Sequence, residues 1–358
     1  MSNSHNAFII GTGRFLPKNI VHNHDFMQHE FLTNKGEAFG SDNATIIKKF
    51  YEITGIQERK YADNDMVASD LGYHAAANAI QDAGIDQETL DYIIVAHNFG
   101  DVAHGSGRVD IMPALASRIK QKLKIKNPYC VAYDLPFGCP GWVEGLIQAN
   151  YFIRSGDAKN ILVIGTETLS RVVDPYDRDS MIYADGAGAT ILSATNRANG
   201  KGILAHLTRS DAQYANLLWM GKTYQKDSCS KDIYIKMHGR KLYSYAISTV
   251  PQLIKDCISK AGIQLGDVKK VLIHQANEKM DQAMLERVFQ LYDCQDIPPH
   301  IMPMIIHKIG NNSVATVPVL LDLIRKEVLD DHRIHPGDHI VFASVGAGMN
   351  CNAIVYRA

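Results

Sequence analysis

Hydrophobic and polar positions along the chain follow two patterns. Short runs rich in β-branched residues, bounded by polar residues and glycines, are typical of strands buried on both faces of a sheet. Such runs occupy residues 93–95, 161–164, 271–273, 340–342 and 353–356. Longer stretches with apolar residues at helical spacing predict helices at 66–82, 142–155, 242–261 and 316–329. Strands that alternate with helices in this way indicate an α/β protein.

The chain repeats this pattern. Residues 79–95 read as a helix end, a glycine stop and a buried strand, and residues 257–273 show the same features about half a chain length later. Both copies contain the triplet Ala-Gly-Ile, whose glycine is expected in the left-handed conformation that ends a helix. Residues 156–165 and 337–346 form a second matching pair. The sequence therefore predicts an internal duplication.

The duplication divides the chain into two similar α/β halves, 1–195 and 196–358. No linker or low-complexity segment separates them, so we expect the halves to share one core. Of the 358 residues 46% are hydrophobic, and the chain has 37 basic and 38 acidic side chains. This balance excludes a disordered chain and a nucleic-acid binder that relies on bulk positive charge.

No membrane span or targeting segment is expected. No apolar run reaches the roughly 18 residues that a membrane span needs, and residues 1–10 lack the basic start of a signal peptide. The six cysteines are scattered without a CxxC pair and are expected to be free thiols. We therefore expect a cytoplasmic protein.

Cys139 lies in a turn rich in proline and glycine, directly before the apolar helical run 143–152. Pro140 suits the first turn of a helix and disfavours helical geometry at the residue before it. Cys139 is therefore expected at the N-cap, where the positive end of the helix dipole lowers a thiol pKa and favours the nucleophilic thiolate. A packed cysteine in an ordinary turn is the alternative.

Three further segments carry polar groups suited to such a nucleophile. His274 directly follows the strand 271–273, at the sheet edge where α/β proteins collect functional groups. Asn311 lies in a turn before a helix, and 346–348 ends a strand with little side-chain bulk, which suits a backbone N–H donor. A structural histidine and ordinary turn chemistry are the alternatives.

In their order and spacing these segments resemble the β-ketoacyl-acyl-carrier-protein synthase III family of the thiolase superfamily, over nearly the whole chain. The segments that carry the resemblance are 10–17, 53–59, 155–157, 174–178, 183–188, 274–277, 310–311 and 346–348. The resemblance implies a thiolase-like, duplicated αβαβα fold of five layers. It also implies an acyltransferase that needs no metal or redox cofactor.

The family's catalytic triad maps onto Cys139, His274 and Asn311. The resemblance implies that Cys139 attacks an acyl thioester and holds the acyl group covalently, with the backbone N–H groups of Cys139 and Ala347 as the oxyanion hole. His274 and Asn311 would bind the carbonyl of the second thioester as its enolate forms. The carbanion then attacks the acyl group on Cys139 and makes a new C–C bond.

The resemblance implies that the substrates are thioesters of acyl carrier protein or coenzyme A. The sequence departs from the family at residues that would bind these substrates. The tryptophan that commonly stacks on adenine is absent from 46–52, although Arg178 is retained, and this favours carrier-protein donors. Lys279 matches a basic docking residue, and Arg240 lies in a segment that could assist. Trp142, close to the nucleophile, indicates a reshaped acyl pocket.

The family forms homodimers, and the loop 97–112 matches one that crosses the dimer interface into the partner's pocket. In branches that do not decarboxylate, this loop brings an acidic base, for which Asp101 and Asp110 are the candidates beside an ordinary loop role. The apolar stretch 214–224 could cap an acyl tunnel or serve core or dimer packing.

The whole pattern is most similar to the branch that joins two acyl chains into dialkylresorcinol-type precursors. A decarboxylating synthase III that initiates fatty-acid synthesis is the alternative. A non-catalytic subunit that only shapes an acyl pocket is the alternative of another class.

Overall fold

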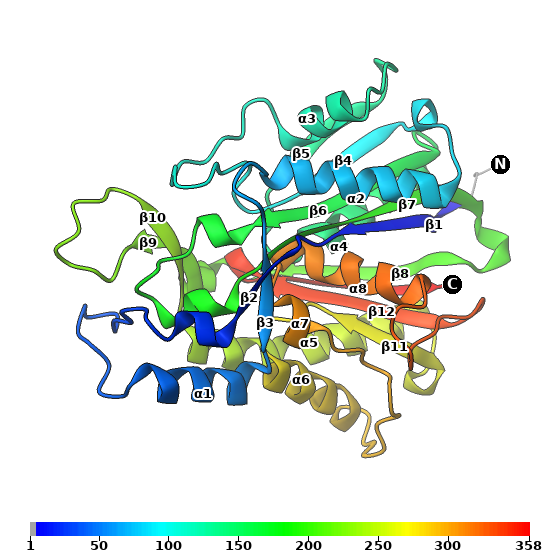
Figure 1. The fold of residues 1–358 in the computed structure, drawn as a ribbon. Helices are drawn as coiled ribbons and strands as arrows, with labels where there is room; N and C mark the ends of the chain where they lie inside the picture. Colours follow the sequence, from blue (N-terminus) through cyan, green and yellow to red (C-terminus); the bar gives the residue numbers. More distant parts are fainter. Residues whose placement is uncertain (1–4) are drawn as a thin grey trace.

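The computed structural model describes residues 5–358 (Figure 1). Residues 1–4, which belong to the segment 1–10 that lacks the start of a signal peptide, lie outside the described residues. Within this range a five-stranded sheet has the order β1-β7-β6-β4-β5, and a four-stranded sheet has the order β11-β12-β13-β8. The strands of the first sheet are β1 (His5–Phe15), β4 (Tyr92–Ala96), β5 (Val131–Leu135), β6 (Asn160–Thr168) and β7 (Asp185–Asn196). Those of the second are β8 (Gly202–Ser210), β11 (Val268–Ile273), β12 (His339–Gly346) and β13 (Asn350–Arg357).

Helices cover both sheets and fill the space between them (Figure 1). They are α2 (Ala68–Ala83) and α3 (Leu115–Lys122) outside the first sheet, α4 (Gly141–Ser155) and α8 (Thr316–Arg325) between the sheets, and α5 (Gly239–Ala261) and α6 (Glu278–Gln290) outside the second. In the central layer Trp142 and Leu146 of α4 and Leu320 of α8 join Phe342 of β12 in one buried cluster. The predicted five-layer αβαβα fold is confirmed.

Smaller elements surround one end of these layers. Two short ribbons pair β2 (Asn19–His22) with β3 (Glu58–Tyr61) and β9 (Leu218–Lys222) with β10 (Ile233–Met237). The helices α1 (Asn43–Thr54) and α7 (Ile306–Ile309) complete this region.

The two sheets share one pairing pattern. In the first, β4 runs parallel to β6, which pairs antiparallel with β7, and β7 pairs antiparallel with β1. In the second, β11, β12, β13 and β8 repeat the same directions in the same order. Gly84 and Gly262, the glycines of the two Ala-Gly-Ile triplets, both end their helices in the left-handed conformation, with φ of 63° and 72°. On this basis we propose the halves 1–195 and 196–358 as the two structural repeats.

The predicted elements coincide with observed ones, and their ends differ. The predicted strands cover only the buried apolar centres of the observed strands. Their ends were missed because the residues there are mostly polar and do not continue the apolar pattern. The helix predicted over 316–329 ends at Arg325, because Glu327 takes a φ of 56° and Val328 N donates to Leu323 O at 2.9 Å, a turn that closes the helix.

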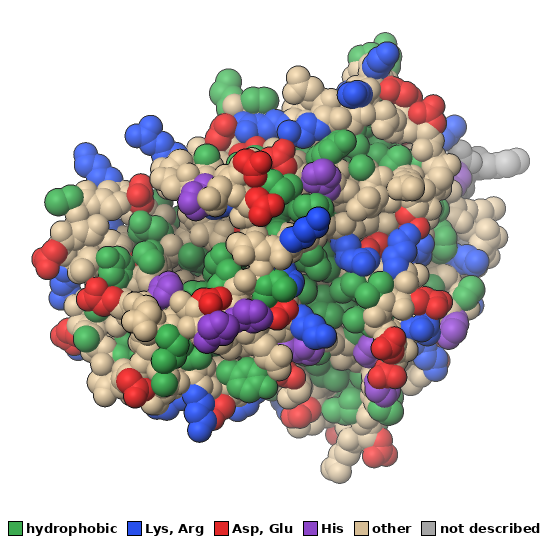
Figure 2. Space-filling model, viewed as in Figure 1, with side chains coloured by type: hydrophobic (Ala, Val, Ile, Leu, Met, Phe, Trp, Pro, Cys, Tyr) green, Lys and Arg blue, Asp and Glu red, His purple; other side chains and the backbone are tan. Residues whose placement is uncertain are grey.

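The surface carries both signs of charge. Acidic and basic side chains are interspersed over the face seen in Figure 2, in keeping with the net charge of −1. Among residues 5–358, no helix combines the length and the apolar character that crossing a bilayer requires.

Candidate active site

Cys139 lies in the loop between β5 and α4, against the end of β12. Gly138 has a φ of 71°, and a Cβ there would lie 2.9 Å from the Ala347 nitrogen. A Cβ on Gly346 would lie 2.6 Å from the Cys139 nitrogen. These glycines therefore allow the two backbone turns, one from each half, to approach closely enough that the N–H groups of Cys139 and Ala347 come from adjacent segments.

The position of Cys139 relative to the helix and the pKa of its thiol differ from the prediction. The N-cap of α4 is Pro140 and the helix begins at Gly141, so Cys139 stands one residue outside the cap. Burial raises the pKa of the Cys139 thiol to about 11, and the hydrogen bond from Ser313 offsets only part of that effect. The expected lowering of the pKa is wrong, because desolvation outweighs the stabilisation of the thiolate at this site.

A cavity of about 390 Å³ opens onto the sulfur. Its polar lining includes Cys139, Asn311, Ser313 and the turn at Ala347. Its remaining wall is largely apolar, and the β9–β10 ribbon supplies Leu218, Trp219, Met220 and Ile235. The stretch 214–224 therefore contributes to the cavity wall. This is consistent with the first of its two predicted roles, the capping of an acyl tunnel.

Asn311 is fixed by its backbone and its side-chain oxygen. Its N–H donates to Ile182 O at 3.0 Å, and its carbonyl accepts from Ala184 N at 2.8 Å. Its Oδ1 accepts from Ser313 N at 2.8 Å, which orients the amide so that the NH₂ group is the donor available to a ligand.

His274 directly follows β11, as predicted, and its backbone N–H donates to Ala343 O at 2.9 Å. The side chain is only 3% exposed, and this burial lowers its pKa to about 4, so the imidazole is neutral at physiological pH. Within the described chain, Cys139 and Asn311 line the cavity and His274 does not. The ring of His274 lies beside the backbone of Ser313, which offsets a small part of the lowering of its pKa and is itself part of the cavity lining.

Sequence reasoning missed three residues that contact the sulfur or its neighbours. The Ser313 hydroxyl donates to Cys139 Sγ at 3.2 Å, and Asn98 Nδ2 donates to Ser313 Oγ at 2.9 Å. The Asn98 backbone N–H donates to Glu167 Oε1 at 3.1 Å, and Asn98 Nδ2 bonds the same oxygen. Glu167 comes three residues after the predicted strand 161–164, near the carboxyl end of β6, so a search for polar residues at the carboxyl ends of strands could have found it.

Of the remaining candidate residues, Ala347 belongs to the described lining of the cavity, and Trp142, Arg178, Lys279 and Arg240 do not. Trp142 is 1% exposed and packs edge-on against Phe342 in the core, so the expectation that it shapes the acyl pocket is corrected. Arg178 is half-exposed, and its guanidinium lies over the Phe39 ring. Lys279 and Arg240 are exposed at the starts of α6 and α5.

Asp101 and Asp110 face each other across a short antiparallel bridge within the loop 97–112. Arg118 binds both carboxylates, at 2.8 Å and 2.7 Å, and Asp101 also accepts from the Ser69 hydroxyl. Neither side chain belongs to the described lining of this chain's cavity.

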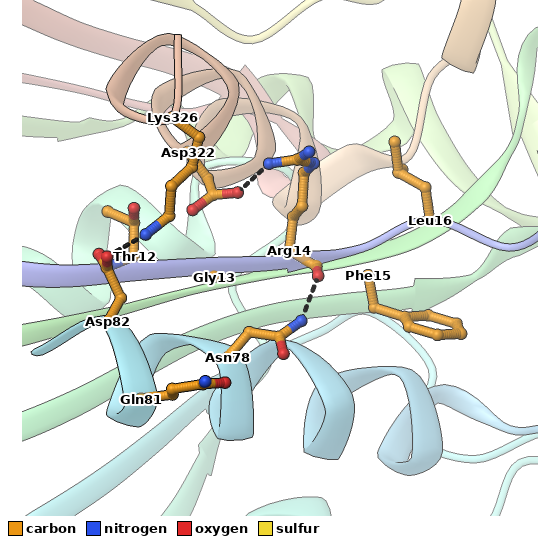
Figure 3. Close-up of a pocket in the computed structure, with 10 residues that line it drawn as sticks. All are labelled: Thr12, Gly13, Arg14, Phe15, Leu16, Asn78, Gln81, Asp82, Asp322 and Lys326. Atoms are coloured by element: carbon orange, nitrogen blue, oxygen red, sulfur yellow. Dashed lines mark hydrogen bonds and ion pairs between the residues drawn. The ribbon is translucent and has the colours of Figure 1, made fainter. Parts of the chain in front are cut away.

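A larger and more open hollow, of about 710 Å³, lies between β1, α2 and α8 (Figure 3). Its charges occur in pairs: Arg14 bonds Asp322, and Lys326 bonds Asp82. It shares no lining residue with the Cys139 cavity, and its described lining contains no cysteine or histidine. The Cys139 cavity is therefore the candidate active site.

Comparison with known proteins gives a consistent result. Residues 133–212 match the family described as 3-Oxoacyl-[acyl-carrier-protein (ACP)] synthase III, and residues 258–358 match its C-terminal part. The chain is 31% identical to Beta-ketoacyl-[acyl-carrier-protein] synthase III 1 of Bacillus cereus, over 98% of this chain and 99% of that one. It is 32% identical to the protein of the same name from Vibrio vulnificus, over 98% of each chain.

Solved structures agree in fold. The 3-oxoacyl-[acyl-carrier-protein] synthase III of Aquifex aeolicus superimposes with a TM-score of 0.79 at 29% identity, over 98% of this chain and all (100%) of that chain. OleA of Xanthomonas campestris, at 18% identity, superimposes with a TM-score of 0.77 over 100% of both chains, which shows the shared fold alone.

Proposed function

The chain belongs to the 3-oxoacyl-[acyl-carrier-protein] synthase III family, and on this premise we propose that it joins an acyl group held on Cys139 to a second, carrier-protein-bound thioester. The resemblance seen in the sequence is confirmed, and with it the assignment as a condensing acyltransferase. The proposal is carried by one observation, the meeting of Cys139, Asn311 and Ala347 around a largely apolar cavity.

The first step is acyl transfer to Cys139. The sulfur attacks the thioester carbonyl, and the N–H groups of Cys139 and Ala347 stabilise the oxyanion. The donor's C–S bond then breaks, and the thiol of the carrier protein or of coenzyme A leaves. The close approach of the Gly138 and Gly346 turns supports this pairing of donors. The apolar wall of the cavity then holds the acyl chain.

The second step forms the carbon–carbon bond. The Asn311 NH₂ group and the neutral His274 ring hydrogen-bond the carbonyl of the extender thioester as its enolate forms. The enolate carbon attacks the acyl group on Cys139, and the Cys139 thiolate leaves. These steps need no metal or redox cofactor, because thiolate attack and enolate formation supply the chemistry.

We favour a decarboxylating extender, a malonyl group on acyl carrier protein, as in initiation of fatty-acid synthesis. Loss of carbon dioxide generates the enolate without a base, and the two candidate bases, Asp101 and Asp110, are both bound by Arg118. Arg178, Lys279 and Arg240 are proposed to receive the donor and the acidic carrier protein, since all three present exposed positive charge.

Condensation of two acyl chains, as in the dialkylresorcinol branch, is the second candidate. It is favoured by the loop that carries Asp101 and Asp110, because its side chains Ile111 and Met112 are 59% and 88% exposed. Such a loop suits insertion into a partner's cavity, where either aspartate would be the base.

We propose a homodimer formed along β5. This strand ends the order of the first sheet, so one of its edges has no partner strand among residues 5–358. Tyr129 before it and Val131 within it are 85% and 47% exposed, and an exposed apolar edge of this kind suits pairing with a second copy.

Intact-mass measurement after incubation with acyl-carrier protein and with acyl-coenzyme A tests the proposal. We expect an acyl adduct on the wild type and none on Cys139→Ala. Absence of an adduct with donors of several chain lengths would overturn the enzymatic role and support the non-catalytic subunit. Product analysis with malonyl- against β-ketoacyl-carrier protein then separates the two extenders.

A further inference from the structure

Glu167 is a buried carboxyl group that the mechanism above does not use. It lies near the carboxyl end of β6 and is 2% exposed. Burial raises its pKa to about 8, although hydrogen bonds from Asn98 and from the Ser313 hydroxyl lower it in part. Burial of an ionised carboxyl group costs free energy, so a buried carboxyl group beside a nucleophile is a candidate for a functional role.

A continuous chain of polar atoms joins this carboxyl group to the sulfur. The Ser313 hydroxyl is within hydrogen-bond distance of Cys139 Sγ, at 3.2 Å, and it lies close enough to Glu167 to lower the pKa of that carboxyl group. Asn98 fixes both neighbours, since its side-chain amide donates to Ser313 Oγ and its backbone N–H to Glu167 Oε1. Because a hydroxyl proton rotates freely, Ser313 can donate to Glu167 while it accepts from the thiol.

We propose that Glu167, acting through the Ser313 hydroxyl, takes up the thiol proton of Cys139 as the sulfur attacks an acyl thioester. This inference rests on the proposed role of Cys139 as the nucleophile. The Cys139 proton passes to Ser313 Oγ while the Ser313 proton passes to the Glu167 carboxylate, so the serine stays neutral. The new S–C bond forms, the donor's C–S bond breaks, and the released thiolate recovers the proton along the same path.

His274 is poorly suited to this task. Burial lowers its pKa to about 4, so the ring is neutral and a weak base, and it is the Ser313 hydroxyl that bonds the Cys139 sulfur. The titratable groups that face these atoms from the packed elements include Asp185 on β7, which raises the pKa of Glu167, Tyr183, whose pKa is raised by burial and by charges that include Cys139, and His274 after β11. Cys139 itself feels the Glu167 charge, which raises the thiol pKa.

The sign of the pH dependence follows from these groups. Glu167 accepts a proton only when ionised, so the rate of Cys139 acylation in the wild type should rise with pH and level off above about 8. In Glu167→Gln the proton must go to solvent, so the rate should keep rising toward the much higher pKa of the thiol. At pH 8.5 we expect this variant to acylate at least about tenfold more slowly, in keeping with the usual gain from a positioned base.

A purely electrostatic or structural role predicts a different result. Removal of the Glu167 charge alone would make the thiolate easier to form, and Glu167→Gln would then react faster than the wild type. A packing role would lower the rate equally at every pH. Either outcome, or an unchanged profile, would overturn the proposal.

The experiment measures single-turnover acylation by octanoyl-coenzyme A and alkylation by iodoacetamide between pH 6 and 10, with the modified peptide identified by mass spectrometry. Ser313→Ala serves as the second variant, because it keeps Glu167 and breaks the chain, and it should lose the same plateau. Glu144→Gln is the matched control, since it removes a carboxylate of α4 that bonds Thr208 and not the sulfur, and its profile should match the wild type.

The two reagents separate the inference from the function on which it rests. If the wild type is alkylated at Cys139 with the plateau but takes no acyl group from any donor, the acyltransferase proposal fails and the proton path stands. If the wild type acylates and Glu167→Gln has the same profile, the proton path fails and the acyltransferase proposal stands.

Discussion

At the scale of single residues, burial keeps the titratable groups of the site uncharged. It raises the pKa of the Cys139 thiol to about 11 and that of Glu167 to about 8, and it lowers the pKa of His274 to about 4. Each shift favours the neutral form near pH 7. An uncharged site is compatible with an apolar cavity, and charge then develops only when a thioester and its oxyanion donors are present.

Asn311 allows the two steps of the reaction to be separated. Asn311→Ala removes a donor to the enolate and leaves Cys139 and Ala347 unchanged, so acyl-Cys139 should still form while condensation falls by about 10²–10³-fold. Intact mass measures the first step, and product formation measures the second. Equal loss of both steps would contradict the assigned role.

Gly346 is predicted to tolerate no side chain. In Gly346→Ala the new Cβ would lie 2.6 Å from Cys139 N and 2.8 Å from Cys139 Cβ, so the two turns must separate. We expect a loss of about 1–3 kcal/mol of stability and a strong loss of acylation. Gly239→Ala, at the start of α5 with nothing within 4 Å of its Cβ, is the control in urea unfolding and should be close to neutral.

At the scale of elements, sequence patterns located the strands and helices that bury apolar surface. Residues 79–95 and 257–273 were predicted in detail, because helix, glycine cap and strand each leave a local signal. The β9–β10 ribbon was not predicted as a pair, and its contact with the cavity depends on Lys236 and Asp174, which lie far apart in the chain. Such a contact is set by tertiary packing, which a single sequence does not display.

Lys236 fixes this ribbon to the body of the protein. Its ammonium group bonds Asp174 at 2.6 Å and Asp177 at 3.1 Å with all three side chains buried, and it lies 3.3 Å from the Tyr224 ring centroid. Lys236→Met leaves two buried carboxylates without their cation, which should cost about 3–5 kcal/mol. Urea unfolding measures the loss, and Lys222→Met, on an exposed position of the same ribbon, should leave the midpoint unchanged.

At the scale of the whole molecule, the site exists only where the two halves meet. Cys139 comes from the first half and Asn311, Ser313 and Ala347 from the second. The family resemblance alone connected Cys139, Asn311 and Ala347 in advance, and nothing in the sequence pointed to Ser313. Composition and periodicity gave the layers of the fold. They could not give the Glu167–Ser313–Cys139 contacts, because these depend on side-chain positions across the interface between the halves.

The proposed dimer makes a prediction at the same scale. If β5 pairs with a second copy, Val131→Lys should introduce a charge into the shared interface and convert the dimer to a monomer, which size-exclusion chromatography with light scattering would detect. Ile53→Lys is the matched control, because Ile53 is similarly exposed, at 51% against 47%, but lies on α1, away from the first sheet. A monomeric wild type would contradict the proposed dimer, and a Val131→Lys variant that stays dimeric would place the interface elsewhere. In the second candidate function the loop 97–112 enters the partner's cavity, so under that mechanism monomers should also lose condensation while the alkylation of Cys139 by iodoacetamide persists.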